Sequence, residues 1–308
     1  MTRRGAAAAA PFSFTSFLFW GGAVGRREIY QRRFFMAGTK IPHVNHIVAV
    51  ASGKGGVGKS TTSMNLAVAL AVQGLRVGLL DADVYGPSQP RMMGVADSQP
   101  ESDGERINPV VAHGVKVMSM GFLSDEQTPM VWRGPMVQSA LMQMLKTVNW
   151  GTDETPLDVL VLDMPPGTGD TQLTLTQQVA LDGAVIVTTP QDIALMDARK
   201  GLEMFNKVNV RVLGIVENMA GFCCPHCGET SDIFGAGGGA RMAAETGVEI
   251  LGRVPLALAV REGTDGGRPL VVNAPESEVA AIYRDLAAKV WEKISAAPVQ
   301  SGVKIVIE

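Results

Sequence analysis

The stretch GKGGVGKS, residues 53–60, decides how this sequence of 308 residues is interpreted. It fits the pattern G-x-x-x-x-G-K-[ST] and lies between an apolar run at 46–52, typical of a buried strand, and an apolar helical pattern at 60–73. Glycines let backbone N–H groups converge on phosphate oxygens, and the N-terminus of the following helix favours negative charge. The stretch therefore predicts a nucleotide phosphate loop. The weaker alternative is a glycine-rich turn that binds nothing.

The residue types in this loop predict particular contacts with ATP. Lys59 is expected to reach the β- and γ-phosphates, where it acts as a catalytic cation, and the Ser60 hydroxyl to bind Mg²⁺. The predicted nucleotide-binding residues of the loop are Gly53, Lys54, Gly55, Gly56, Val57, Gly58, Lys59, Ser60 and Thr61.

Three aspartates stand at the ends of two further apolar runs. Asp81 and Asp83 follow the run at 76–81, and Asp163 ends the run at 157–163. The carboxyl ends of parallel strands meet at the edge of a sheet where ligands bind. Asp81 and Asp163 are therefore predicted to serve Mg²⁺, and Asp83 to orient the attacking water as a catalytic residue. The alternative for each is an ordinary turn aspartate.

The whole chain alternates between strand-like and helical patterns. Continuous apolar runs, as expected for strands covered on both faces, occur at 46–52, 76–81, 115–120, 157–163, 183–189, 210–218 and 248–255. Helical patterns occur at 60–73, 136–147 and 277–294, and residues 86–112 read as a long loop. This order predicts an α/β fold at 41–295, a single doubly wound, mainly parallel sheet with flanking helices, followed by a tail at 296–308.

Charge divides the chain unevenly. Residues 1–40 carry seven basic and one acidic residue, a net +6, so the net charge of −3 leaves −9 for the rest. An acidic body argues against nucleic-acid binding. The Arg-, Ala-, Phe- and Ser-rich start predicts a mitochondrial presequence and a matrix location, with a secretory signal at 6–20 as the alternative. That segment is too short and interrupted to predict stable membrane insertion.

All three cysteines lie in FCCPHCGETSDIFG, residues 222–235. Cys224 and Cys227 form a C-x-x-C pair, and two thiolates cannot complete a metal site. The pair is therefore a redox dithiol, an inert pair, or half of a zinc or iron–sulfur site that a second chain completes. His226 is expected to be solvated rather than a ligand, and Cys223 receives no role.

Several motifs together carry a family resemblance. KGGVGKST (54–61) resembles the deviant phosphate loop of MinD-type NTPases, which implies that Lys54 crosses a dimer interface to the partner's ATP and acts catalytically there. The segments DADVYGPS (81–88), WRGPM (132–136), DMPPGTGD (163–170), VENM (216–219) and CPHCG (224–228) occur in the same order in the Mrp/NBP family of P-loop iron–sulfur carriers.

This resemblance implies a homodimer that holds a labile [4Fe-4S] cluster between Cys224 and Cys227 of both chains. It implies loading by upstream cluster donors, slow ATP hydrolysis and delivery to apo iron–sulfur proteins. Together with the presequence, the chain is similar to mitochondrial members that support assembly of respiratory complex I. The resemblance also implies that Asn218 recognises adenine and that the chain near Pro255 lines the base pocket.

Two other kinds of protein compete with this interpretation. A spatial-organising ATPase of the MinD or ParA type, with a zinc or redox C-x-x-C, needs a membrane helix or a basic face. The short, mixed C-terminal segment and the acidic body offer neither. A metabolic P-loop enzyme needs further acid–base groups, and none of the four histidines lies in a recognisable catalytic motif.

Overall fold

The structure, a computed structural model, describes residues 38–122 and 134–296. At the centre of the described residues is an eight-stranded sheet with the strand order β12-β9-β8-β1-β7-β2-β6-β5. These strands are β1 Val44–Ala51, β2 Val77–Asp81, β5 Val110–Ala112, β6 Val115–Ser119, β7 Leu157–Asp163, β8 Gly183–Thr188, β9 Val212–Asn218 and β12 Ile250–Val254. All neighbours pair in parallel except β5, which is antiparallel to β6.

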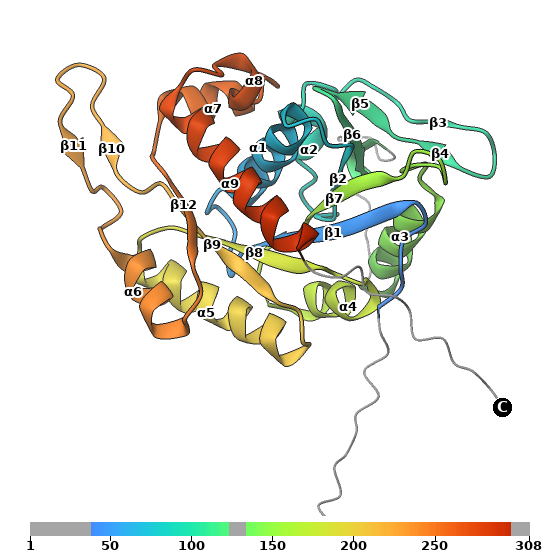
Figure 1. Cartoon of the computed structure of the whole chain (residues 1–308), viewed down its shortest axis with the longest axis horizontal. Helices are drawn as coiled ribbons and strands as arrows, with labels where there is room; N and C mark the ends of the chain where they lie inside the picture. The colour runs from blue at the N-terminus through green and yellow to red at the C-terminus, as the bar shows by residue number, and fades with distance from the viewer. Residues whose placement is uncertain (1–37, 123–133, 297–308) are drawn as a thin grey trace, which may run out of the picture. The chain divides into compact units, whose positions relative to one another are not determined.

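Helices cover both faces of the sheet (Figure 1). One face carries α1 Lys59–Val72, α2 Gln89–Met92, α7 Leu258–Asp265, α8 Leu270–Asn273 and α9 Glu278–Ser295; the other carries α3 Gly134–Thr147, α4 Asp170–Gln178, α5 Asp192–Lys207 and α6 Gly238–Thr246. Two apolar cores result, because successive strand residues point to opposite faces. Leu79 of β2 joins the core under α1 and α9, and Leu80 joins the core over α3.

The strand register brings the predicted acidic residues together. Asp81, the last residue of β2, pairs with Asp163, the last residue of β7, and Val50 of β1 pairs with Asp163 from the other side. Since β1 runs directly into the phosphate loop, both carboxylates lie at the same edge of the sheet as that loop.

The predicted doubly wound, mainly parallel sheet is confirmed, and each predicted strand and helix is found within a few residues of its expected bounds. The prediction of a long loop at 86–112 is wrong. This region contains α2, the small antiparallel pair of β3 Glu101–Ser102 and β4 Ile107–Asn108, and β5. These elements are too short for their periodicity to be visible in the sequence. Residues 1–37, Trp132 and Arg133 of WRGPM, and 297–308 lie outside the described residues.

The cysteine segment folds as a small element of its own. It is a two-stranded antiparallel hairpin, β10 Phe222–Cys223 paired with β11 Thr230–Ser231, which projects away from the sheet (Figure 1). None of the described helices has the length and apolar character of a membrane span.

Candidate functional site

The phosphate loop joins the end of β1 to the start of α1, and its glycines have distinct structural reasons. Gly56 and Gly58 have φ angles of +80° and +84°, which favour glycine. At Gly53 a β-carbon would lie 2.2 Å from the carbonyl carbon of Asp197, so the loop packs directly on α5. Gly55 faces open space, with no atom closer than 4.0 Å to a β-carbon there.

The loop surrounds a hollow of about 220 Å³. Its lining comprises Ser52, Lys54, Gly55, Gly56, Gly58, Lys59, Ser60, Thr61, Asp83 and Pro166. The structure thus brings Lys54, Lys59, Ser60 and Asp83 together around one space, as the sequence predicted. Gly53 and Val57 instead support the loop from behind. The buried Val57 accepts a hydrogen bond at its carbonyl oxygen from Asn218 Nδ2 at 2.9 Å.

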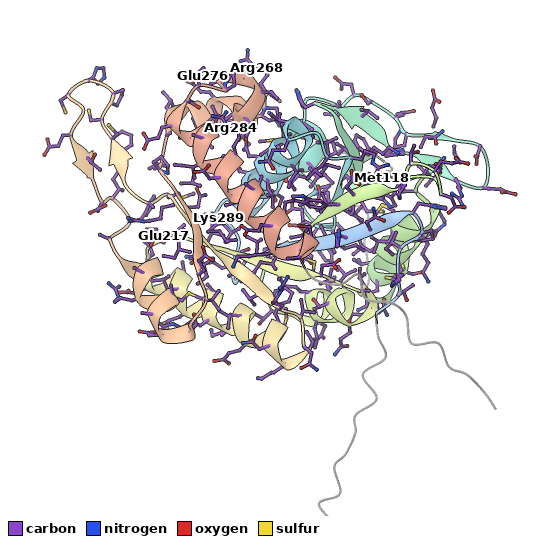
Figure 2. All side chains as sticks on the ribbon, viewed as in Figure 1. Met118, Glu217, Arg268, Glu276, Arg284 and Lys289 are labelled. Atoms are coloured by element: carbon purple, nitrogen blue, oxygen red, sulfur yellow. The ribbon has the colours of Figure 1, made fainter. Side chains whose placement is uncertain are left out.

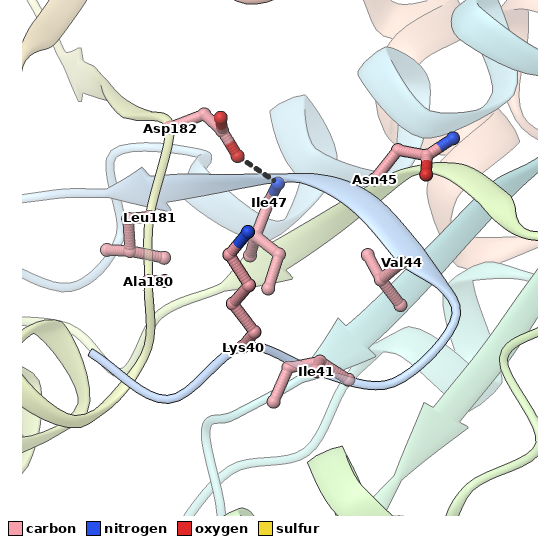
Figure 3. Close-up of a pocket in the computed structure, with 8 residues that line it drawn as sticks. All are labelled: Lys40, Ile41, Val44, Asn45, Ile47, Ala180, Leu181 and Asp182. Atoms are coloured by element: carbon pink, nitrogen blue, oxygen red, sulfur yellow. Dashed lines mark hydrogen bonds between the residues drawn. The ribbon is translucent and has the colours of Figure 1, made fainter. Parts of the chain in front are cut away.

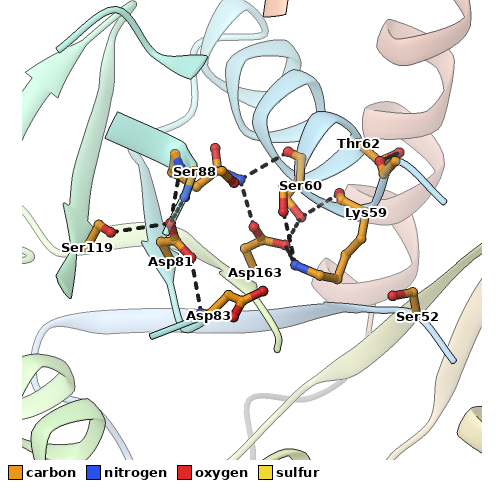
Figure 4. A network of polar contacts seen from close by, with 12 residues as sticks. Ser52, Lys59, Ser60, Thr62, Asp81, Asp83, Ser88, Ser119 and Asp163 are labelled. Atoms are coloured by element: carbon orange, nitrogen blue, oxygen red, sulfur yellow. Dashed lines mark hydrogen bonds and ion pairs between the residues drawn. The ribbon is translucent and has the colours of Figure 1, made fainter. Parts of the chain in front are cut away.

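A buried ion pair stands at the centre of the polar network in Figure 4. Lys59 Nζ lies 2.5 Å from Asp163 Oδ1 and 3.1 Å from Ser60 Oγ, and Asp163 is fully buried. Ser63 of α1 donates to the same carboxylate oxygen at 2.8 Å. The charge of Lys59 is therefore held beside the loop by a carboxylate from the neighbouring strand.

Gln89, at the start of α2, is a site residue that the sequence reasoning missed. Its Nε2 donates to Asp163 Oδ2 at 2.8 Å and to the Ser60 carbonyl at 3.0 Å, and the side chain is fully buried. Its Oε1 is buried without a hydrogen-bond partner among the described residues. The only available signal in the sequence was its position directly after DADVYGPS.

Asp81 and Asp83 occupy different environments. Asp81 accepts hydrogen bonds from the backbone N–H groups of Ser88 and Gln89 at 2.9 and 3.1 Å, and burial together with the nearby Asp163 raises its pKa to about 7. Asp83 lines the hollow, and desolvation raises its pKa as well. Asp81 is thus buried close to Asp163, whereas Asp83 faces the hollow.

These residues fit a Mg²⁺–nucleotide. Mg²⁺ prefers oxygen ligands and keeps several waters. Ser60 Oγ and the carboxylates of Asp81 and Asp163 could supply oxygen ligands. Gln89 Oε1 is a buried acceptor with no hydrogen-bond partner in the described part of the chain. Lys59 and Gln89 hydrogen-bond to the two carboxylate oxygens of Asp163, so a metal ion held by Asp163 would replace at least one of these contacts.

The cysteines lie at the turn of the β10–β11 hairpin. Cys223 and Cys227 are exposed, and Cys224 is partly exposed. Two backbone hydrogen bonds of 2.9 Å close the turn: Cys224 N–H donates to the Glu229 carbonyl, and Gly228 N–H donates to the Cys224 carbonyl. The N–H groups of Cys227 and His226 lower the pKa of the Cys224 thiol. Among the described residues no group of three or more His, Cys, Asp or Glu side chains is arranged to hold a metal ion.

Another hollow, of about 210 Å³, lies at the opposite end of β1 from the phosphate loop (Figure 3). Lys40, Ile41, Val44 and Leu181 line part of it. Its carboxylate, Asp182, already accepts from Ile47 N–H at 2.8 Å and faces His46 Nδ1 at 3.2 Å. This hollow takes no part in the site around the phosphate loop.

A glycine loop between β1 and α1, its buried lysine–aspartate pair and the parallel sheet define a P-loop NTPase. The sequence model of the family described as NUBPL iron-transfer P-loop NTPase matches residues 43–291. The chain therefore belongs to this family, which confirms the resemblance seen in its motifs.

Named relatives agree with this assignment. The chain is 57% identical to the iron-sulfur cluster carrier protein of Pseudomonas fragi over 80% of its own length and 85% of that protein. It is 55% identical to the iron-sulfur protein required for NADH dehydrogenase, mitochondrial, of Arabidopsis thaliana, covering 80% of this chain and 78% of that one. A Salmonella typhimurium iron-sulfur cluster carrier protein, also 55% identical, is longer, and the chain spans 66% of it.

Solved structures support the fold. A nucleotide-binding protein from Archaeoglobus fulgidus in complex with ADP is 37% identical, with a TM-score of 0.67 over 78% of this chain and 93% of that chain. The Pyrococcus furiosus cell division ATPase MinD is 24% identical, with a TM-score of 0.58 over 80% of this chain and 99% of that one. The second likeness shows a MinD-type fold and nothing further.

Proposed function

We propose that this chain is an ATP-binding carrier that holds a [4Fe-4S] cluster between two copies of itself and delivers it to apoproteins. The observation that carries the proposal is the pair Cys224 and Cys227, the first partly and the second fully exposed, at the turn of a hairpin that projects from a P-loop NTPase fold. Membership of an iron-transfer family supports the cargo.

The number of ligands favours a shared cluster. A [4Fe-4S] cluster takes four thiolates, and each chain offers two in the C-x-x-C motif. A two-fold dimer brings identical hairpins together and supplies all four. The lowered pKa of Cys224 favours the thiolate that binds iron, and exposure of the turn leaves the cluster accessible for transfer. Cys223 and His226 are not assigned as ligands.

The nucleotide half of the proposal uses the residues around the phosphate loop. Lys59 would bind the β- and γ-phosphates, Lys54 those of the partner's ATP, and Asp83 would orient the attacking water. Ser60, Asp81 and Asp163 would hold Mg²⁺, which when bound neutralises phosphate charge. Asn218 and Pro255 would contact the adenine base; Asn218 lies directly behind the loop, and Pro255 follows β12. ATP hydrolysis would be slow, because a carrier needs ATP to change between loading and release states and not for rapid turnover.

We also propose a mitochondrial matrix location through residues 1–40, cluster loading by upstream donors, and subunits of respiratory complex I among the recipient apoproteins. Support comes from the basic start of the chain and from the Arabidopsis relative, which is named for NADH dehydrogenase and the mitochondrion.

Anaerobic reconstitution with iron and sulfide tests the cluster site. The full chain should take up iron and sulfide in equal amounts with the broad absorption of a [4Fe-4S] cluster, and Cys224→Ala or Cys227→Ala should lose both. Cys223→Ala is the matched control, since it removes a neighbouring thiol of the same hairpin, and should load normally. Uptake of zinc alone, or loading that survives both substitutions, would contradict the proposal and favour a structural or redox C-x-x-C.

A further inference from the structure

We propose that Glu217 is a positioning residue that mounts the cysteine hairpin on the phosphate loop, so that nucleotide binding alters how the hairpin holds its cluster. This inference rests on the proposed function and deepens it by naming how the two sites communicate. Its basis is a set of contacts at both ends of the segment 219–237, which contains the hairpin.

The first end of this segment leaves β9 directly after Asn218. The Asn218 side chain lies against the phosphate loop, donating to the Val57 carbonyl at 2.9 Å, and a β-carbon at Gly58 would lie 2.0 Å from its Nδ2. Met219 then turns the chain with a φ of +57°, and Ala220 N–H bonds the Val254 carbonyl at 2.9 Å. This end of the segment is therefore held in direct contact with the phosphate loop.

Glu217 fastens the second end. Its side chain is buried; Oε1 accepts from Gly239 N–H in the first turn of α6, and Oε2 accepts from Arg253 Nε, both at 2.7 Å. A β-carbon at Gly239 would lie 2.8 Å from Oε1. Figure 2 shows Glu217 below the hairpin, between it and α6. One side chain thus ties the strand before the hairpin to the helix after it.

A second route runs through α5. A β-carbon at Gly238 would lie 2.6 Å from the Pro190 carbonyl oxygen and 2.5 Å from Leu195 Cδ1, so the start of α6 packs directly on the start of α5. The same helix meets the phosphate loop, at Gly53. Both ends of the segment are therefore joined to the loop by contacts too close for one extra carbon. Close-packed contacts of this kind transmit displacements rather than absorb them.

The carboxylate is essential to this connection because it carries a charge. A negative group at a helix N-terminus is stabilised by the helix dipole, and Arg253 compensates the buried charge from the partly exposed side. Glutamine retains the size and one acceptor oxygen of Glu217 but loses the charge. Glu217→Gln therefore weakens the hydrogen bonds to Gly239 and Arg253 without leaving a cavity.

The test uses the full chain, loaded with cluster and mixed with an apo [4Fe-4S] acceptor, with and without Mg²⁺–ATP. The measured quantity is the ratio of the two transfer rates. Glu249→Gln is the matched control: Glu249 precedes β12, pairs with Lys293 at 2.9 Å and is half exposed. Wild type and the control should show a ratio that differs from one by about fivefold or more, the lower range of allosteric coupling. Glu217→Gln should move that ratio measurably towards one, because the contacts through α5 remain, while cluster loading and nucleotide affinity stay unchanged.

A ratio in Glu217→Gln equal to wild type would overturn the inference. Hydrogen exchange of the cluster-free protein with and without Mg²⁺–ADP provides a readout that does not depend on the cargo. ADP should change exchange in 219–239 in wild type and change it less in Glu217→Gln; equal changes in both proteins, or no change in wild type, would also overturn the inference. If wild type takes up no cluster, the proposed function fails, and the exchange result still decides the inference. Should Glu217→Gln fold poorly, Arg253→Gln, which alters the exposed partner, takes its place.

Discussion

Lys59 and Asp163 are both buried, so each depends on the other for the stability of its charge. Removing one member of a buried ion pair leaves an uncompensated charge and typically costs about 3–5 kcal/mol. We therefore expect Lys59→Ala to lower the free energy of unfolding by about that amount and to abolish nucleotide binding. Chemical denaturation and a fluorescent ATP analogue measure the two effects.

Lys54→Ala is the control for this prediction, since Lys54 belongs to the same loop, lines the same hollow and is only partly buried. Its effect on the unfolding free energy should stay within about 0.5 kcal/mol, as for surface substitutions. Equal destabilisation by the two substitutions would show that the ion pair has no special role.

Asp81 makes stability depend on pH in an unusual direction. Burial raises its pKa from the ordinary 3.8 to about 7, so between these values the folded protein retains a proton that the unfolded chain has lost. Stability from this group is therefore full below about pH 4 and falls as pH rises towards 7. Asp81→Asn removes the titration, so the unfolding free energy of wild type minus that of the variant should fall across this window in metal-free buffer.

Asp158→Asn provides a control of opposite sign. The Arg76 guanidinium, 2.5 Å from Asp158 Oδ1, holds the pKa of that carboxyl below its ordinary value. Its contribution to stability is therefore present above the unfolded pKa and is lost as pH falls. Thermal unfolding of the three proteins from about pH 2 to 8 makes the comparison, since the Asp158 contribution is lost only below its ordinary pKa of 3.8. If the difference in unfolding free energy between wild type and Asp81→Asn stays constant or rises with pH, the raised pKa of Asp81 is contradicted.

At the scale of elements, the phosphate loop and α5 meet with no room for a side chain at Gly53. Gly53→Ala must force the two apart, because its β-carbon would lie 2.2 Å from the backbone of Asp197. We expect a loss of about 1–3 kcal/mol in unfolding free energy, the typical range for overpacked sites, and roughly a tenfold or greater loss of nucleotide affinity from the displaced loop. Gly55→Ala, two residues away and facing open space, should change neither by much. Comparable losses in both variants would refute this account of the contact.

The larger elements could be predicted from the sequence because their patterns are long. Continuous apolar runs identified β1, β2, β7 and β8, and helical spacing identified α9. The phosphate loop followed from residue types and from the strand and helix beside it. Its residues Lys54, Lys59 and Ser60 surround one hollow together with Asp83, which follows β2.

The remaining features depend on tertiary contacts that leave no periodic signal. The helix α2 has only four residues, and its first residue, Gln89, is positioned by the Asp81 carboxylate rather than by helix propensity. The β10–β11 hairpin has two residues in each strand, too few for alternation to be read. Glu217 looked like part of an ordinary apolar strand, and only the structure shows that its carboxylate reaches α6.

In the whole molecule, a P-loop NTPase fold carries a small hairpin that contains all three cysteines. The C-x-x-C pair supplies two of the four thiolates that a [4Fe-4S] cluster takes. The proposed function therefore requires two copies of the chain.

Native mass spectrometry of the anaerobically reconstituted protein is the decisive measurement for a shared cluster. We expect a species whose mass equals two chains plus one four-iron, four-sulfide cluster, and we expect the cluster mass to disappear in Cys224→Ala. A single chain carrying a complete cluster, or a dimer that binds zinc in place of iron and sulfide, would contradict the shared cluster.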